Sequence, residues 1–162
     1  MTEYERCWEL FRRRDLEGVS YEDVATCARM LAQLIPQDYR AGKMISDLGE
    51  VWACTILRMT RMPQGHRGYD AVDEKGVVDR KGLRYQIKTR SPEVGDRVNE
   101  GGTVGRFTNF DFDGALLVLL DSNLQTYDLC VVERQVLESQ LRPGRNDITI
   151  AKFKALGRCL PD

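Results

Sequence analysis

The sequence predicts an α/β domain with one mixed β-sheet, preceded by helices, and three segments carry this prediction. Residues 51–57 (VWACTIL) are the uncharged second half of a helix expected over residues 39–59, and a helix that is apolar on nearly every side is enclosed in a core. Residues 83–89 (LRYQIKT) alternate in the manner of a β-strand. Residues 115–120 (ALLVLL) form a continuous apolar run, which is typical of a central strand covered on both faces.

The N-terminal part of the chain is predicted to be a helical extension. A short helix is expected over residues 3–14. Ser20 is predicted to cap a second helix, with Asp23 in the acidic position of a capping box. Residues 1–36 are therefore expected to serve packing or dimerisation, and residues 37–162 are expected to form the α/β domain.

Strands, a loop and helices are expected between the central helix and the end of the chain. Residues 91–106 contain four glycines and are expected to be a loop without regular structure, and long loops of this kind are often functional. The other expected elements are strands at residues 69–73 and 127–132, a turn at 74–76, a helix at 135–141 and a closing segment at 148–156.

Composition excludes several classes of protein. The chain has 162 residues, 42% of them hydrophobic, with 24 Lys and Arg against 25 Asp and Glu, so it is neither disordered nor strongly charged. No apolar run approaches the roughly 18 residues that span a bilayer, and the charged N-terminus does not have the apolar core of a signal peptide. A cytoplasmic protein without contact to a membrane is therefore expected. No glycine-rich phosphate loop or nucleophile elbow is present, so no organic cofactor is expected.

The cysteines do not form a recognisable framework. They are five in number, widely spaced and without a CxxC pair, which argues against a zinc ribbon and against a set of disulfides. We interpret them as small buried hydrophobic residues in a reducing environment. They are Cys7, Cys27, Cys54, Cys130 and Cys159. His66 is the sole histidine, so carboxylates and lysine are expected to carry any catalysis.

Four polar residues stand where the surrounding pattern favours apolar ones. Glu50 borders the uncharged half of the central helix, and Asp70 opens a strand. Gln86 and Lys88 are two residues apart in the next strand, so their side chains leave the same face. With Asp70 alongside them and the helix carboxylate above that face, this group suits a hard divalent cation such as Mg²⁺.

In this order, Glu50, Gly68-Tyr69-Asp70 and Gln86-Ile87-Lys88 resemble the signature of the restriction-endonuclease-like PD-(D/E)XK nuclease superfamily. The QxK pair, in which Gln86 replaces an acid, is similar to the Mrr-like branch. The resemblance implies a restriction-endonuclease-like core, with a central mixed sheet flanked by helices. It also implies a Mg²⁺-dependent endonuclease that hydrolyses phosphodiester bonds in DNA, in restriction, repair or phage defence.

The resemblance also implies a role for each residue of the site. Glu50, Asp70, the Gln86 amide oxygen and the Ile87 carbonyl would hold Mg²⁺, with Mn²⁺ as the alternative cation. Lys88 would orient the attacking water or neutralise charge on the phosphate. Two other roles stay open, because Lys88 can also form a salt bridge with Asp70, and Asp70 can also cap a turn.

A basic stretch gives separate support for binding nucleic acid. Residues 75–106 contain eight bases and four acids, and a basic surface suits a phosphate backbone. The expected DNA contacts are Arg67, Arg90, Arg97 and Arg106. Two alternatives remain open. The chain is either an active nuclease, which is expected to be a homodimer if it cuts both strands, or a nuclease-like fold without activity that binds DNA or protein.

Overall fold

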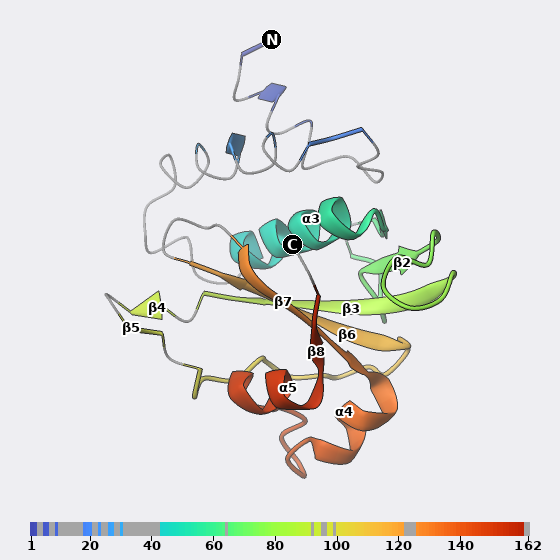
Figure 1. Ribbon diagram of the computed structural model, residues 1–162, viewed down its shortest axis with the longest axis vertical. Coiled ribbons are helices and arrows are strands. Elements are labelled where there is room, and N and C mark those ends of the chain that lie inside the picture. Colours follow the sequence, from blue (N-terminus) through green and yellow to red (C-terminus); the bar gives the residue numbers. More distant parts are fainter. Residues whose placement is uncertain are drawn as a thin grey trace.

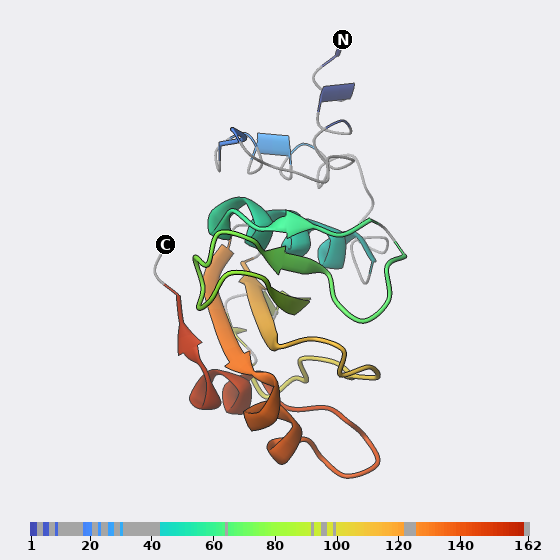
Figure 2. The same ribbon diagram turned by 90° about the vertical axis from the view of Figure 1, so that its right-hand side faces the viewer.

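A six-stranded sheet carries helices on both of its faces in this protein (Figures 1 and 2). Helix α3 (Lys43–Leu57) covers one face, and α4 (Arg134–Gln140) and α5 (Ile150–Leu156) cover the other. The computed structural model describes residues 1–2, 5–6, 9, 18–20, 23, 26–27, 30, 43–63, 65–91, 93–94, 97–98, 100–121 and 126–160. Within them the expected α/β architecture with a mixed sheet flanked by helices is confirmed.

The sheet has six strands in the order β1-β2-β3-β6-β7-β8. The pairing of β3 with β6 is parallel and the other pairings are antiparallel, which makes the sheet mixed. The strands are β1 (Thr60–Arg61), β2 (Ala71–Asp73), β3 (Leu83–Arg90), β6 (Gly114–Leu120), β7 (Thr126–Glu133) and β8 (Arg158–Cys159). The two-residue strands β1 and β8 are the edges, and the sequence did not predict either of them.

The central position of β6 follows from its composition. All seven of its residues are buried, because β3 and β7 flank it and helices cover both faces. Leu116 and Val118 pack with Trp52 of α3, whereas Leu117 and Leu119 pack with Phe153 of α5 and its neighbours. The apolar run therefore supplies both halves of the core, as the sequence predicted.

The uncharged half of α3 is enclosed as predicted. Val51, Trp52, Ala53 and Cys54 are completely buried against the sheet. Among the described N-terminal residues, Cys27 joins this core, and Val19 and Met30 pack against it. The predicted cap of the second helix is also present, because the backbone N–H of Asp23 donates to Ser20 Oγ at 3.0 Å. Most of both predicted N-terminal helices lies outside the described residues.

The connection from β3 to β6 differs from the expected loop. It contains a two-stranded hairpin formed by β4 (Glu93–Val94) and β5 (Arg97–Val98), so the prediction of a loop without regular structure is wrong. Its later part is also fixed to the α5 side, because the Val104 N–H donates to the Ile148 carbonyl at 2.8 Å. The side chains of Val104 and Phe107 are buried there and extend the core beneath β6.

The cysteines depart from their expected role at one position. Cys27, Cys54 and Cys130 are buried as predicted, but Cys159 in the edge strand β8 is exposed. The general interpretation as buried hydrophobic residues is therefore wrong for Cys159, which lies opposite Cys130 of β7. No helix within the described residues is long and apolar enough to cross a membrane.

Candidate metal and phosphate site

Asp70 occupies a gap in the hydrogen-bond ladder between β2 and β3. Strand β2 begins only at Ala71, opposite Tyr85, so the main chain that precedes it does not pair with β3 at Ile87. The backbone N–H of Ile87 therefore needs another acceptor. Asp70 Oδ2 accepts that N–H at 2.7 Å and the Gln86 amide Nε2 at 2.5 Å. The carboxylate is thereby fixed at the edge of β3, within reach of both faces of the sheet.

Glu50 approaches from α3, on the face that carries Tyr85 and Ile87. Its side chain is 19% exposed, and Arg61 Nε of β1 donates to its Oε2 at 3.3 Å. Burial and then the negative charge of Asp70 raise the pKa of Glu50 to about 7, although Arg61 opposes this increase. Burial also raises the pKa of Asp70, against the effects of the Ile87 N–H and of Lys88. The two acids therefore concentrate negative charge in a poorly solvated place.

Gln86 and Lys88 leave the opposite face of β3. Tyr85 and Ile87 belong to the core under α3, whereas the Lys88 ammonium lies 5.3 Å from the ring centre of Phe107, in the core beside α5. The expectation that the helix carboxylate stands above the face of Gln86 and Lys88 is therefore wrong. Asp70 reaches both sides because it lies directly before the first residue of β2, at the edge of β3.

Lys88 is held in an apolar setting. Burial lowers its pKa most strongly, and the nearby carboxylates of Asp70 and Glu50 raise it again. Among the described residues, no carboxylate oxygen lies within 4.0 Å of Lys88 Nζ. The salt bridge to Asp70, the alternative that the sequence left open, is therefore not formed in this structure. The ammonium still interacts with the charges of these two acids at a longer distance, because both of them raise its pKa.

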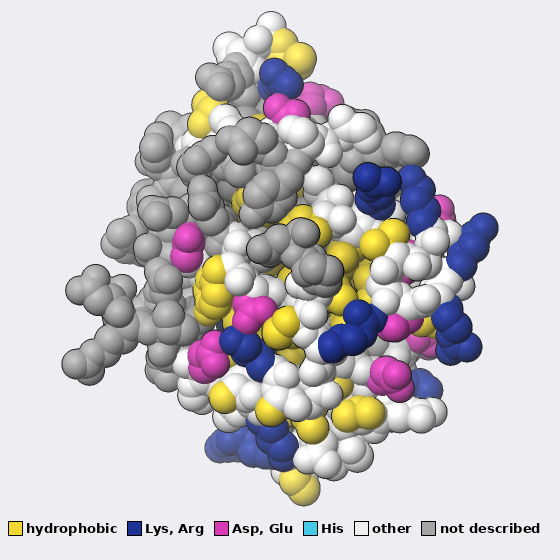
Figure 3. Space-filling view, viewed as in Figure 1, with side chains coloured by type: hydrophobic (Ala, Val, Ile, Leu, Met, Phe, Trp, Pro, Cys, Tyr) yellow, Lys and Arg dark blue, Asp and Glu magenta, His cyan; other side chains and the backbone are white. Residues whose placement is uncertain are grey.

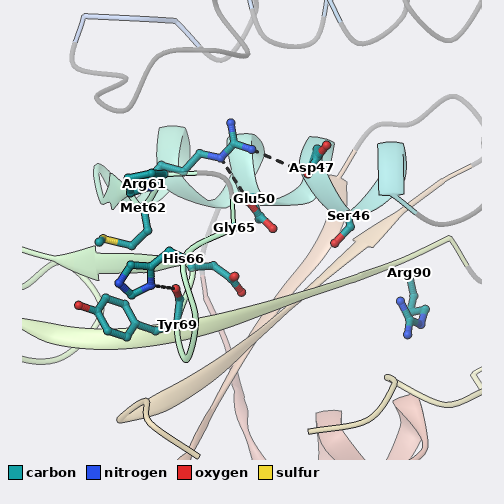
Figure 4. Close-up of a pocket in the computed structure, with 11 residues that line it drawn as sticks. Ser46, Asp47, Glu50, Arg61, Met62, Gly65, His66, Tyr69 and Arg90 are labelled. Carbon is teal, nitrogen blue, oxygen red and sulfur yellow. Dashed lines mark hydrogen bonds and ion pairs between the residues drawn. The ribbon is translucent and has the colours of Figure 1, made fainter. Parts of the chain in front are cut away.

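A cavity of about 450 Å³ opens beside the two carboxylates (Figure 4). Figure 4 shows Ser46, Asp47 and Glu50 projecting from α3, with His66 and Tyr69 across from them and Arg90 at the far end. Gln86 and Lys88 do not line the cavity. Its lining residues are Ser46, Asp47, Glu50, Arg61, Met62, Pro63, Gly65, His66, Tyr69, Asp70 and Arg90.

The expected DNA-contacting arginines are placed differently from one another. Arg90 lines the cavity, and its guanidinium donates to the carbonyls of Thr89 and Thr103 at 2.6 and 3.0 Å. Arg67 and Arg106 are exposed on loops. Arg97 lies in β5, and its side chain is outside the described part of the structure. Among the three whose side chains are described, Arg90 is thus the one that lines the cavity, at the end away from Glu50.

Other bases of the stretch 75–106 lie on the turn between β2 and β3. Lys75, Arg80 and Lys81 are exposed there, and Figure 3 shows Lys and Arg side chains along the edge of the molecule where β2 lies in Figure 1. Arg84 instead pairs with Asp113, between Nε and Oδ2 at 3.1 Å. Asp73, the last residue of β2, is buried and accepts the N–H of Gly76, Val77 and Val78, so its carboxylate holds this turn.

Arg61 and Asp47 are the site residues that the sequence did not predict. Arg61 bridges the two acids of α3, with Nη2 at 4.0 Å from Asp47 Oδ1 in addition to its contact with Glu50. The spacing of Asp47 and Glu50, three residues apart on one helix, was a signal for Asp47. Arg61 belongs to a two-residue edge strand and gave no comparable signal.

Gly49 brings α3 close enough to the sheet to place Glu50. A Cβ atom at this position would overlap the Oγ1 and Cγ2 atoms of buried Thr89 in β3. We expect Gly49→Ala to lower the free energy of unfolding by about 1–3 kcal/mol, because the helix or the strand has to shift. Urea denaturation measures this change. In a Thr89→Ala background the same substitution should cost less, and equal costs in both backgrounds would contradict the close contact.

Comparison with known proteins adds no assignment. The chain matches no protein-family model and no curated protein. The cavity itself offers two carboxylates with raised pKa values and a fixed guanidinium, and the half-buried ammonium of Lys88 lies near these acids on the opposite face of β3. Groups of this kind can hold a divalent cation and contact an anionic substrate.

Proposed function

We propose that the chain is a Mg²⁺-dependent nuclease that hydrolyses phosphodiester bonds in DNA. The observation that supports this most is the meeting of Glu50 and Asp70, which come from separate elements and lie half-buried beside one cavity, near Lys88. Like charges in a poorly solvated place are costly, so their presence at a cavity favours a function that uses them. The fold supplies an α/β sheet flanked by helices, and its restriction-endonuclease-like character is part of this proposal.

The donor set fits a hard cation. Asp70 Oδ2 is used by Gln86 and the Ile87 N–H, and the second carboxylate oxygen remains to meet a cation together with Glu50. Because N–H and C=O of one strand residue leave the same edge, the Ile87 carbonyl also faces the side of Asp70. The Gln86 nitrogen faces Asp70 here, so in this arrangement Gln86 orients that carboxylate. A bound Mg²⁺ or Mn²⁺ would polarise the phosphate and lower the pKa of a bound water.

The basic groups have separate roles in this proposal. The Lys88 ammonium lies in a half-buried, apolar setting, where it stabilises negative charge on the phosphate more strongly than it would in water. Arg90 is held by two backbone carbonyls and presents its guanidinium to the cavity, where it contacts a phosphate group. Exposed Arg67 and Arg106 add contacts to the backbone of the nucleic acid.

A second candidate function is a nuclease-like module without activity that binds DNA or protein. The contact of Arg61 with Glu50 and Asp47 favours this alternative, because a guanidinium already neutralises the acids that a metal would need. Gln86, a neutral residue where most members of the resembled superfamily carry an acid, favours it as well. In the active form, Arg61 has to move away from Glu50 when a cation binds.

One experiment distinguishes the two candidates, and it compares Lys88→Ala with Lys152→Ala on supercoiled and linear DNA in Mg²⁺ or Mn²⁺. We expect the wild type and Lys152→Ala, which changes an exposed residue of α5 outside the basic stretch and the cavity, to cleave equally. Lys88→Ala should cleave about 10²–10³-fold more slowly while it still binds DNA, because it removes charge stabilisation at the phosphate. If the wild type binds a DNA duplex without cutting it in either metal, the binding module is the correct function.

A further inference from the structure

Two cysteines that are 29 residues apart in sequence meet at the edge of the sheet, far along the sheet from the carboxylate site. Cys130 of β7 and Cys159 of β8 are direct partners in an antiparallel pair, and their Sγ atoms are 2.9 Å apart. Directly opposite residues in such a pair have Cα atoms about 4.5–5.5 Å apart. That separation lies within the range of about 4.4–6.8 Å found in disulfides.

The backbone around β8 holds the two thiols together. Gly157 lies against the carbonyl of Val131, where a Cβ atom would clash, so the chain can return close to β7 only with glycine at this position. One residue beyond Cys159, the N–H of Leu160 donates to the Leu129 carbonyl at 2.7 Å. The contact between the thiols is therefore fixed on both sides by main-chain packing.

The two thiols differ in their surroundings. Cys130 is buried in the core on the side of α5, whereas Cys159 is exposed. The Cys130 thiol donates to Asp128 Oδ1 at 3.5 Å, and Asp128 is paired through Oδ2 with Lys154 at 2.6 Å. Burial, the hydrogen bond with Cys159 and the charge of Asp128 raise the pKa of Cys130. An exposed thiol beside a protected one is the arrangement in which the exposed thiol attacks a disulfide first and the protected thiol then resolves the mixed disulfide.

We propose that Cys130 and Cys159 form a redox-active dithiol that exchanges with low-molecular-weight disulfides such as oxidised glutathione. The Cys159 sulfur, as thiolate, attacks one sulfur of oxidised glutathione, and one glutathione leaves as a thiolate that takes up the proton lost by Cys159. The Cys130 sulfur then attacks Cys159 Sγ, and the second glutathione leaves with the proton from Cys130. Two protein thiols become one disulfide, and one glutathione disulfide becomes two thiols.

The disulfide would join the edge strand β8 covalently to β7. The segment enclosed between Cys130 and Cys159 contains α4 and α5, which form the layer on one face of the sheet. Closing a loop of this length restricts the unfolded chain, so the oxidised protein is expected to have a Tm about 5–10 °C higher than the reduced protein. This proposal does not depend on the nuclease function, because it uses none of the residues around the carboxylate cavity.

The test treats the reduced chain with oxidised glutathione and maps the products by mass spectrometry. We expect a peptide in which Cys130 is linked to Cys159, without bound glutathione. Cys130→Ser should stop at a glutathione adduct on Cys159, and Cys159→Ser should leave Cys130 unmodified. Cys7→Ser serves as the control, and it should form the linked peptide as the wild type does.

Three outcomes would overturn the proposal, and each can be read in the wild type without any variant. In the first outcome the two thiols stay reduced in excess oxidised glutathione. In the second, a glutathione adduct on Cys159 persists and Cys130 does not displace the glutathione. In the third outcome the purified chain holds one equivalent of Zn²⁺, and exchange occurs only after a chelator removes it. Asp128, Cys130 and Cys159 would then be metal ligands, since their ligand atoms all lie within 4.8 Å of one another.

Discussion

Asp70→Asn is expected to slow metal-dependent cleavage by about 10³-fold or more, the largest effect of any single substitution in the proposed site. A cation bound at a carboxylate contributes several kcal/mol to stabilising the transition state, and about 1.4 kcal/mol corresponds to a factor of ten. Asparagine removes the negative charge but keeps a carbonyl oxygen that can accept the N–H of Ile87 and the amide of Gln86. Calorimetry with Mg²⁺ should therefore show binding by the wild type and none by the variant, alongside the loss of cleavage.

The same substitution should not weaken the fold. Because the folded pKa of Asp70 is raised, the folded state holds its proton to higher pH than the unfolded state does. Stability is thus lost as the pH rises from the unfolded pKa through the folded pKa, and the neutral Asn side chain avoids this loss. At neutral pH we expect Asp70→Asn to unfold at the same urea concentration as the wild type or at a higher one.

Asp73→Asn is the matched control for this experiment. Asp73 lies three residues along the chain and is completely buried, but its two oxygens accept backbone N–H groups of a turn. Replacing one of those oxygens by an NH₂ group leaves a buried donor facing a donor, at a cost of about 1–3 kcal/mol. A result in which Asp70→Asn is the destabilising change would identify Asp70 as a turn cap, the alternative that the sequence left open.

The parts of the fold that the sequence predicted are those in which burial dictates composition. The apolar run of β6, the uncharged half of α3 and the alternation of β3 each reflect which faces are covered. The same alternation placed Gln86 and Lys88 on one face correctly. It did not say which helix covers that face, because both faces of β3 can pack under a helix. One face carries Tyr85 and Ile87, and the other carries the long apolar stem of Lys88.

The missing elements are those whose pairing depends on contacts distant in sequence. Strands β1 and β8 have two residues each, too few for a periodic pattern, and they exist because β2 and β7 provide an edge to pair with. The contact of Cys130 with Cys159 depends on that pairing as well. Arg61 enters the candidate site through β1. Its pairing with Glu50 and Asp47 therefore could not be predicted from the sequence either, because β1 is too short to show a periodic pattern.

Glu50 makes the stability of the protein depend on pH, and this effect is the second largest that we expect. Its pKa changes from an ordinary value of 4.5 to about 7 in the folded protein. At about 1.4 kcal/mol for each pKa unit, ionised Glu50 destabilises the fold by roughly 3 kcal/mol. The folded state binds the extra proton, so stability is greatest below the unfolded pKa and falls as the pH rises from about 4.5 to about 7.

Glu50→Gln should therefore be more stable than the wild type at pH 8, by up to about 3 kcal/mol, and equally stable at pH 4. Urea denaturation across this range measures the difference. Glu74→Gln, which changes an exposed acid in the turn after β2, is the control for the substitution itself. A difference between Glu50→Gln and the wild type that stays constant from pH 4 to pH 8 would contradict the raised pKa.

A bound cation should reverse the preference of Glu50 for its proton. In the proposed site Mg²⁺ would bind the ionised carboxylate, so below pH 7 each bound cation would have to displace a proton from Glu50. The affinity for Mg²⁺ should then rise about tenfold for each pH unit up to pH 7 and level off above it. Calorimetry in two buffers with different ionisation enthalpies detects the released proton, which should disappear in Glu50→Gln. If wild-type affinity is constant between pH 5 and pH 8, Glu50 does not ligate the cation, and its carboxylate serves only to hold Arg61 beside α3.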